Sequence, residues 1–152
     1  MARTELEIRP LRREDFDSVV DIDQQVFRNA RPEYFAGKFA RILDEKDRIV
    51  TALVALANGK VVGFVMGELF VGEYGIPATM ATLDTIGIHP EYQRKGVARQ
   101  LMEAFVGHLG KAGVEKINTL VSWDDWQLIR FFSTSGFEPA KTMCLDFDLT
   151  RL

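Results

Sequence analysis

The sequence predicts a single α/β domain built around a mixed β-sheet. Stretches with apolar residues at helical spacing interleave with stretches rich in Val, Ile and Leu. The chain has 152 residues, which suits one domain with a sizeable core, and it contains no repeat period and no low-complexity segment. We therefore expect one domain over residues 1–152.

The first half of the chain is expected to contain two helices and three strands. Pro10 should end the first strand, and Pro32 suits the first position of the second helix. Asn58-Gly59 is a strong signal for a two-residue hairpin turn. The expected elements are strand 6–9, helix 13–28, helix 32–47, strand 49–57 and strand 60–70.

The second half begins with a loop marked by Gly72, Gly75 and Pro77, which could line a substrate cleft. Asp124 or Asp125 could cap the last helix, and a glycine is well placed to end it. The last strand is expected because Met143, Leu145, Phe147 and Leu149 alternate with Cys144, Asp146 and Asp148. The expected elements are strand 79–88, helix 96–110, strand 115–122, a helix ending at Gly136 and strand 143–149.

The composition argues against several classes of protein. The net charge of −3 lacks the basic footprint of a nucleic-acid-binding protein, and no long uncharged apolar stretch suggests a membrane span. The N-terminus enters charged sequence without the apolar stretch of a signal peptide, so we expect a cytoplasmic protein. His89, His108 and Cys144 have no metal-ligand spacing, so no metal is expected, and Cys144 is interpreted as a small core or sheet residue.

The segment from Leu83 to Met102 is the most informative part of the chain. An apolar strand runs into Pro90, then into a short basic loop with one glycine, Gly96, and then into an amphipathic helix. The first N–H groups of a helix lack intrahelical partners and carry partial positive charge, so such a junction favours an anion. The alternative is an ordinary basic loop that caps a surface helix.

The same segment resembles a known family. The run Gln93-Arg94-Lys95-Gly96-Val97-Ala98 fits the Gln/Arg-x-x-Gly-x-Gly/Ala signature of the GNAT superfamily of N-acetyltransferases. Downstream, Gly136-Phe137 resembles the point where the family's next strand begins. The resemblance spans roughly residues 6–149 and implies a single-domain GNAT-like fold, with a mixed, mostly antiparallel sheet flanked by about four helices.

The resemblance also implies acetyl-CoA as the acyl donor. Amides of the basic loop would wrap the pyrophosphate, and its cationic side chains would add positive potential toward the 3′-phosphate. Backbone N–H groups of the fourth strand would bind the pantetheine arm, and that of Ile88 is assigned the catalytic role of polarising the thioester carbonyl. The residues assigned to the cofactor are Ile86, Gly87, Ile88, Gln93, Arg94, Lys95, Gly96, Val97, Ala98, Arg99, Asp125 and Phe132.

An ammonium acceptor must lose a proton before it attacks, which calls for a basic side chain near it. Asp84 lies in the expected fourth strand, where many GNAT proteins carry a proton-accepting group, and is the assigned base, acting directly or through water. Glu68 and Glu73 are alternatives. Asp84 could instead make a structural hydrogen bond at a strand edge.

Two positions depart from the family pattern. Phe132 stands where many GNAT proteins carry a Tyr that protonates the departing thiolate, and Asp125 stands where an Asn is often found. The thiolate could leave unassisted or take a proton from water, with Ser133 and Tyr92 as weak substitutes for the acid. The two neighbouring tryptophans, Trp123 and Trp126, are interpreted as core residues that could alternatively cover the cofactor or acceptor.

The resemblance implies an enzyme that moves the acetyl group of acetyl-CoA directly to a primary amine of a small molecule, peptide or protein. The missing Tyr and Asn leave open a coenzyme A binding or sensing module, and a domain that keeps only the fold. Homodimerisation also stays open, because the Phe-rich helix 32–47 and strand 143–149 could each serve an interface or the core.

Overall fold

The computed structural model describes residues 5–27, 31–44, 50–71 and 79–151. Its contacts divide the chain into two compact units, Met1–Leu120 and Val121–Leu152, and each is considered by itself. The expected loop with Gly72, Gly75 and Pro77, and Glu73 within it, lies outside the described residues. Of the helices that the structure describes, none combines the length and the apolar character required to traverse a bilayer.

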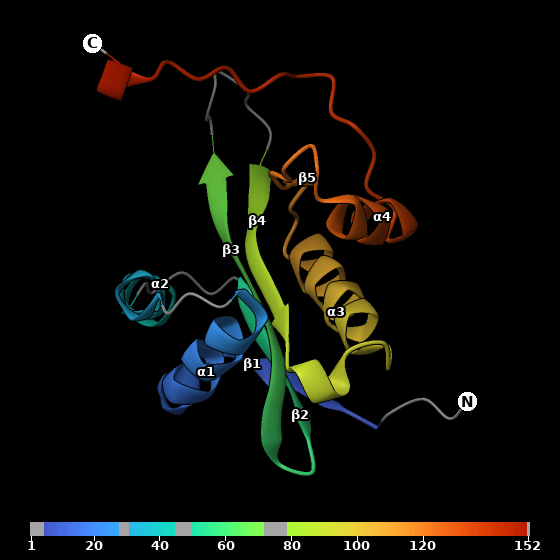
Figure 1. The fold of residues 1–152 in the computed structure, drawn as a ribbon. Helices are drawn as coiled ribbons and strands as arrows, with labels where there is room; N and C mark the ends of the chain where they lie inside the picture. The colour runs from blue at the N-terminus through green and yellow to red at the C-terminus, as the bar shows by residue number, and fades with distance from the viewer. Residues whose placement is uncertain (1–4, 28–30, 45–49, 72–78, 152) are drawn as a thin grey trace. The chain divides into compact units, whose positions relative to one another are not determined.

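The first unit is built on a five-stranded sheet with the order β1-β2-β3-β4-β5. Neighbouring strands are antiparallel except for β4 and β5, which are parallel. This arrangement confirms the predicted mixed, mostly antiparallel sheet, and Figure 1 shows the long β3 and β4 strands at its centre. The strands are β1 (Glu7–Pro10), β2 (Ala52–Ala57), β3 (Lys60–Val71), β4 (Thr79–Ile88) and β5 (Lys116–Asn118).

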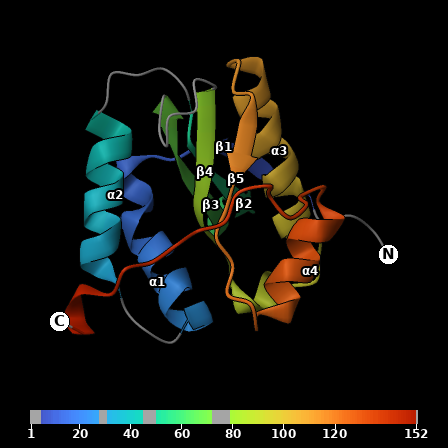
Figure 2. The same cartoon turned by 90° about the horizontal axis from the view of Figure 1, so that it is seen from above.

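Helices cover both faces of this sheet. Figures 1 and 2 show α1 (Phe16–Phe27) and α2 (Pro32–Asp44) on one face and α3 (Val97–Lys111) on the other. On the α1 and α2 side, the buried rings of Phe35 and Phe64 meet edge to face with centroids 5.7 Å apart. The phenylalanines of α2 therefore serve the core, which is one of the two roles that the sequence left open for them.

The ends of two strands follow the sequence signals with one difference. Asn58 (φ 51°) and Gly59 (φ 77°) form the predicted turn of the β2–β3 hairpin, since both residues take the left-handed conformation that such a turn requires. Pro10 is the last residue of β1 and does not lie outside it, as the sequence suggested. Proline is tolerated there because β1 is an edge strand and needs no further backbone donor.

A bulge interrupts the pairing of β3 with β4. Met66 lies opposite Thr85, but the next residue, Gly67, lies opposite Leu83, so Asp84 has no partner on β3. A Cβ atom on Gly67 would come within 2.4 Å of the Thr82 carbonyl oxygen, so only glycine fits at this point. Gly67 allows β3 to lie close to β4 at Thr82, and the extra residue in β4 interrupts the regular pairing at Asp84.

Replacing Gly67 by alanine should destabilise the fold. We expect Gly67→Ala to lower the free energy of unfolding by about 1–3 kcal/mol, because the new methyl group meets backbone that cannot rotate away. Urea denaturation is the measurement. Gly107→Ala in α3 is the matched control: its Cβ meets nothing within 4 Å, so it should be neutral or stabilising. Equal effects at the two positions would contradict the close approach.

The parallel strand β5 is shorter than the predicted strand 115–122. It pairs only with Met80, Ala81 and Thr82 of β4, and the Thr119 hydroxyl donates one further hydrogen bond to the Leu83 carbonyl at 2.9 Å. Beyond that point, none of the described residues pairs with β4 on its β5 side. Among the described residues, the edge of β4 over residues 84–88 therefore has no strand partner, and we call it the open edge of β4.

The second unit contains α4 (Trp126–Thr134), which begins and ends as predicted. The Asp125 carboxylate accepts a hydrogen bond from the backbone N–H of Leu128 at 3.1 Å, as expected of an N-cap. Gly136 follows the helix with φ 101°, and the N–H of Phe137 donates to the Phe132 carbonyl at 3.0 Å.

The predicted strand 143–149 is wrong. Residues 138–148 form no strand in the structure, and 149–151 form a single 3-10 turn. Alternation makes a segment suited to a strand, but a strand also needs a partner for its backbone groups, and none of the described residues provides one. The interpretations of Cys144, Trp123 and Trp126 as core residues are also wrong, because all three side chains are exposed.

Candidate functional site

The open edge of β4 presents backbone N–H groups. The N–H of His89 donates to the Val62 carbonyl at 2.8 Å, toward β3, and successive N–H groups along a strand point to opposite edges. The N–H groups of Ile88 and Ile86 therefore point away from β3. The Ile88 carbonyl agrees, because it accepts a hydrogen bond at 3.1 Å from the Gln93 side chain on that edge. An extended ligand could pair here as a further strand does.

The basic loop between β4 and α3 holds two left-handed residues, Arg94 (φ 62°) and Gly96 (φ 82°). Gly96 is the N-cap of α3, and the N–H of Gln100 donates to its carbonyl at 3.1 Å. The N–H groups of Val97, Ala98 and Arg99 precede this first helical bond, so helix geometry leaves them without intrahelical partners. A Cβ atom at Gly96 would meet nothing within 4 Å, so the backbone there is open to close approach.

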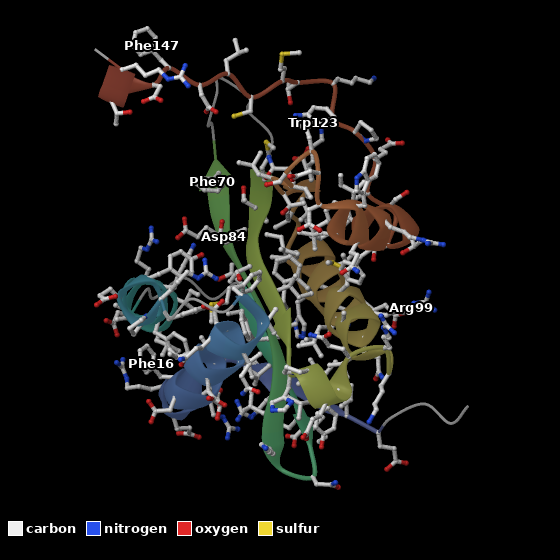
Figure 3. All side chains as sticks on the ribbon, in the orientation of Figure 1. Phe16, Phe70, Asp84, Arg99, Trp123 and Phe147 are labelled. Atoms are coloured by element: carbon white, nitrogen blue, oxygen red, sulfur yellow. The ribbon has the colours of Figure 1, made fainter. Side chains whose placement is uncertain are left out.

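Charge reinforces the anion-binding character of this junction. Arg94, Lys95 and Arg99 are exposed, and the first turn of α3 has no acidic residue. Figure 3 shows Arg99 at the N-terminal part of α3. The Lys95 ammonium lies 5.3 Å from the centroid of the Tyr92 ring. The loop thus combines free helical amides with three cations, as the sequence predicts for a phosphate-binding element.

Gln93 and His89 have local structural roles. Besides tying the loop to the end of β4, Gln93 closes the short 3-10 turn Pro90–Tyr92 that precedes it. His89 caps the same turn, since its Nδ1 atom accepts a hydrogen bond from the N–H of Glu91 at 3.1 Å. Both residues fix how the chain leaves β4 and enters α3.

The Asp84 carboxylate lies on the side of the sheet that α2 covers, where it meets a buried lysine (Figure 3). Its Oδ2 atom forms a short ion pair with the ammonium of Lys38, whose side chain is only 5% exposed. Lys38 also donates to Oε1 of Glu68 at 2.8 Å, and Arg41 reaches the same oxygen at 3.0 Å. Asp84, Glu68, Lys38 and Arg41 form what we call the α2–sheet ion cluster.

The electrostatics of this cluster keep Lys38 charged. Burial lowers the pKa of Lys38, but its hydrogen bonds to Asp84 and Glu68 outweigh burial, so the pKa is raised above its usual value. Burial raises the pKa of Tyr34, whose ring centroid lies 6.0 Å from the Lys38 ammonium. Lys38 is therefore a permanent cation at neutral pH, and Tyr34 stays a neutral phenol.

Sequence reasoning missed Lys38 as part of the site. A polar stripe begins directly before α2 and continues along it, beside the apolar stripe of Phe35 and its neighbours. Its members are spaced by three or four residues and so share one side of the helix: Arg31, Tyr34, Lys38 and Arg41. This stripe was the available signal. A second ion pair holds its first member: Arg31 donates to the fully buried Asp23 of α1 at 2.6 and 3.0 Å.

The two site residues expected in the second unit are placed within that unit alone. Asp125 caps α4, so its carboxylate already has a backbone partner. Phe132 is buried, and its ring centroid lies 5.0 Å from that of Phe137 and 5.4 Å from that of Phe131. Their roles toward a cofactor stay predictions.

Comparison with known proteins agrees with this geometry. The sequence profile described as Acetyltransferase (GNAT) family matches residues 16–137, which include the α2–sheet ion cluster, the open edge of β4 and the basic loop. The chain belongs to the GNAT family. The predicted GNAT membership and GNAT-like fold are thereby confirmed.

A curated GNAT relative is the [Ribosomal protein bS18]-alanine N-acetyltransferase of Escherichia coli strain K12. It is 31% identical over 83 residues, a match that covers 55% of this chain and 51% of the relative. The chain thus spans about half the length of the curated relatives it matches.

Solved GNAT structures share the fold over a longer range. An aminoglycoside N-acetyltransferase AAC(6')-Iy in complex with CoA has a TM-score of 0.77 at 17% identity, covering 95% of each chain. The ribosomal-protein-S18-alanine N-acetyltransferase of Escherichia coli has a TM-score of 0.74 at 23% identity, covering 90% of this chain and 79% of that one. These likenesses establish the fold.

Proposed function

We propose that this protein transfers the acetyl group of acetyl-CoA directly to a primary amine. One observation carries the proposal: the open edge of β4 runs from the bulge at Asp84 to the anion-binding start of α3. A donor with a pyrophosphate at one end and an amide-containing arm at the other suits this path, since the loop favours the phosphates and the strand edge favours the amides.

The residues present fit acetyl-CoA. The free amides of Val97, Ala98 and Arg99 and the open backbone at Gly96 would hold the pyrophosphate. The exposed Arg94, Lys95 and Arg99 add positive charge for the remaining phosphate. The N–H groups of Ile86 and Ile88 would bind the arm, and one of them would donate to the thioester oxygen. Acetyl-CoA supplies an activated acyl group.

The reaction needs one proton acceptor. As the amine nitrogen bonds to the acetyl carbon, the carbon–sulfur bond breaks and the amine loses a proton. Asp84 is our candidate for its acceptor, because Lys38 engages Oδ2 and the described residues offer no hydrogen-bond partner to Oδ1. Phe132 has no proton to give the thiolate, so water takes that role. Holding both reactants together supplies the largest part of the rate.

The acceptor class is inferred from the general chemistry of carboxylates and amines. A carboxylate is a weak base, and it suits an amine that is already partly neutral. At pH 7.5 about a third of peptide α-amines are neutral, against about one lysine amine in a thousand. The curated relative is named for an alanine N-acetyltransferase acting on a ribosomal protein. We therefore propose a peptide α-amine as the preferred acceptor.

The test is release of free thiol from acetyl-CoA by the purified protein with a panel of amines. The panel contains peptides with a free α-amine, the same peptides with a blocked α-amine and one lysine, polyamines and aminoglycosides. Thiol release with α-amine peptides, and an acetylated product by mass spectrometry, is the expected result. Acetyl-CoA binding in calorimetry without product across the panel would instead favour a coenzyme A sensor and overturn the transferase.

A further inference from the structure

We propose that Lys38 is a positioning residue for acetyl transfer, which fixes the orientation of the Asp84 carboxylate through their ion pair. The inference rests on the proposed function, because it assumes that Asp84 receives the proton of the acceptor. It assigns a reaction role to a residue that comes from α2, away from the loop signature.

Burial and geometry limit what else Lys38 can do. Its side chain is 5% exposed and its ammonium donates to two carboxylates from two different strands, Glu68 of β3 and Asp84 of β4. An ammonium held by two carboxylates is a poor nucleophile, because it must lose both hydrogen bonds and a proton to react. Lys38 is therefore neither a second acceptor nor a base, and its chemistry is to orient the groups it contacts.

The bulge makes this contact necessary. Asp84 is the extra residue of β4 and lacks the cross-strand partner that would fix an ordinary strand residue. Its side chain is 20% exposed, so without a partner it could take several rotamers. The ion pair with Lys38 selects one of them. It engages Oδ2, while the described residues offer Oδ1 no partner, which leaves Oδ1 for the acceptor.

The other charged side chains around Asp84 and Lys38 are held in ion pairs of their own. Arg41 of α2 holds Glu68, while Arg31, directly before α2, holds Asp23 of α1, and Tyr34 is a neutral phenol beside Lys38. Lys38 is the cation of the cluster that contacts Asp84. Removing it therefore takes away the contact that orients Asp84, while the other pairs remain.

The test is how the loss of activity in Lys38→Met divides between kcat and KM. An Asp84 side chain that is no longer held in place should lower kcat by about tenfold or more, because a small misplacement of a reacting group costs at least that much. Affinity for acetyl-CoA should stay within about twofold of the wild type. Lys38→Arg keeps a cation that can donate to both carboxylates, so it should restore most of kcat.

Arg41→Met is the matched control. It removes a cation from the same cluster, but Arg41 contacts Glu68 and its side chain is 59% exposed, so kcat should not fall. If Lys38→Met does not fold, Lys38→Gln replaces it, because its side chain is polar but one atom too short to reach the place of the ammonium. An unchanged kcat in either folded variant overturns the role of Lys38. Full activity of Asp84→Asn would instead refute the base itself, so the two failures are distinguishable.

Discussion

Asp84→Asn should lower kcat/KM with a peptide α-amine by about 10²- to 10⁴-fold at neutral pH, which is the usual contribution of a general base. The amide keeps the shape of the side chain and can still contact Lys38, but it cannot accept a proton from the amine. Steady-state thiol release at neutral pH is the measurement.

Affinity for acetyl-CoA separates loss of chemistry from loss of binding. The donor is proposed to lie along the N–H groups of Ile86 and Ile88, so calorimetry should give Asp84→Asn nearly the wild-type affinity. Glu68→Gln is the matched control, because Glu68 shares Lys38 with Asp84 but lies opposite Thr82 in the regularly paired part of β4. A larger loss of rate in Glu68→Gln than in Asp84→Asn would reverse the assignment of the base.

The sequence predicts the phosphate-binding junction because its signals are local. A strand, a proline turn, one glycine and an amphipathic helix follow one another within twenty residues of chain, and the backbone they specify needs no distant partner. Gly96 is left-handed and opens α3, and Arg94 shares that conformation. Charge and helix geometry then favour an anion at this junction without further information.

The surroundings of Asp84 could not be predicted in this way. The bulge at Asp84 depends on the register between β3 and β4, which a single strand does not encode. Lys38 reaches Glu68 and Asp84 across 30 and 46 residues of sequence. A lysine in the polar stripe of a helix is usually solvated, and only the packing of α2 on the sheet makes this one a buried ion-pair partner.

The end of the chain illustrates the same limit in the other direction. Met143 to Leu149 alternate strictly, and the alternation is compatible with a half-buried strand. Among the described residues the segment has no strand partner, and Met143, Leu145, Phe147 and Leu149 are exposed. The alternation therefore predicts which side chains would share one face of a strand. It does not predict whether another strand is present to pair with the backbone, and a strand requires both.

The second large effect is expected from Gly96→Val, which should weaken acetyl-CoA binding by at least about tenfold, or about 1.4 kcal/mol. A β-branched residue is strained at φ 82°, so the loop should leave the left-handed conformation and move the amides of Val97, Ala98 and Arg99. Because the strain acts on binding, KM for acetyl-CoA should rise more than kcat falls. Calorimetric titration with acetyl-CoA is the measurement.

Gly59→Val provides a control with the same kind of backbone strain at another place. Gly59 has φ 77°, and a Cβ atom there meets nothing within 4 Å, as at Gly96. Both variants should therefore lose a similar amount of stability, about 1–2 kcal/mol from the left-handed conformation alone. Only Gly96→Val should lose affinity, because Gly59 lies in the β2–β3 turn and not at the start of α3. Unchanged affinity in a folded Gly96→Val protein would remove the basic loop from the donor site.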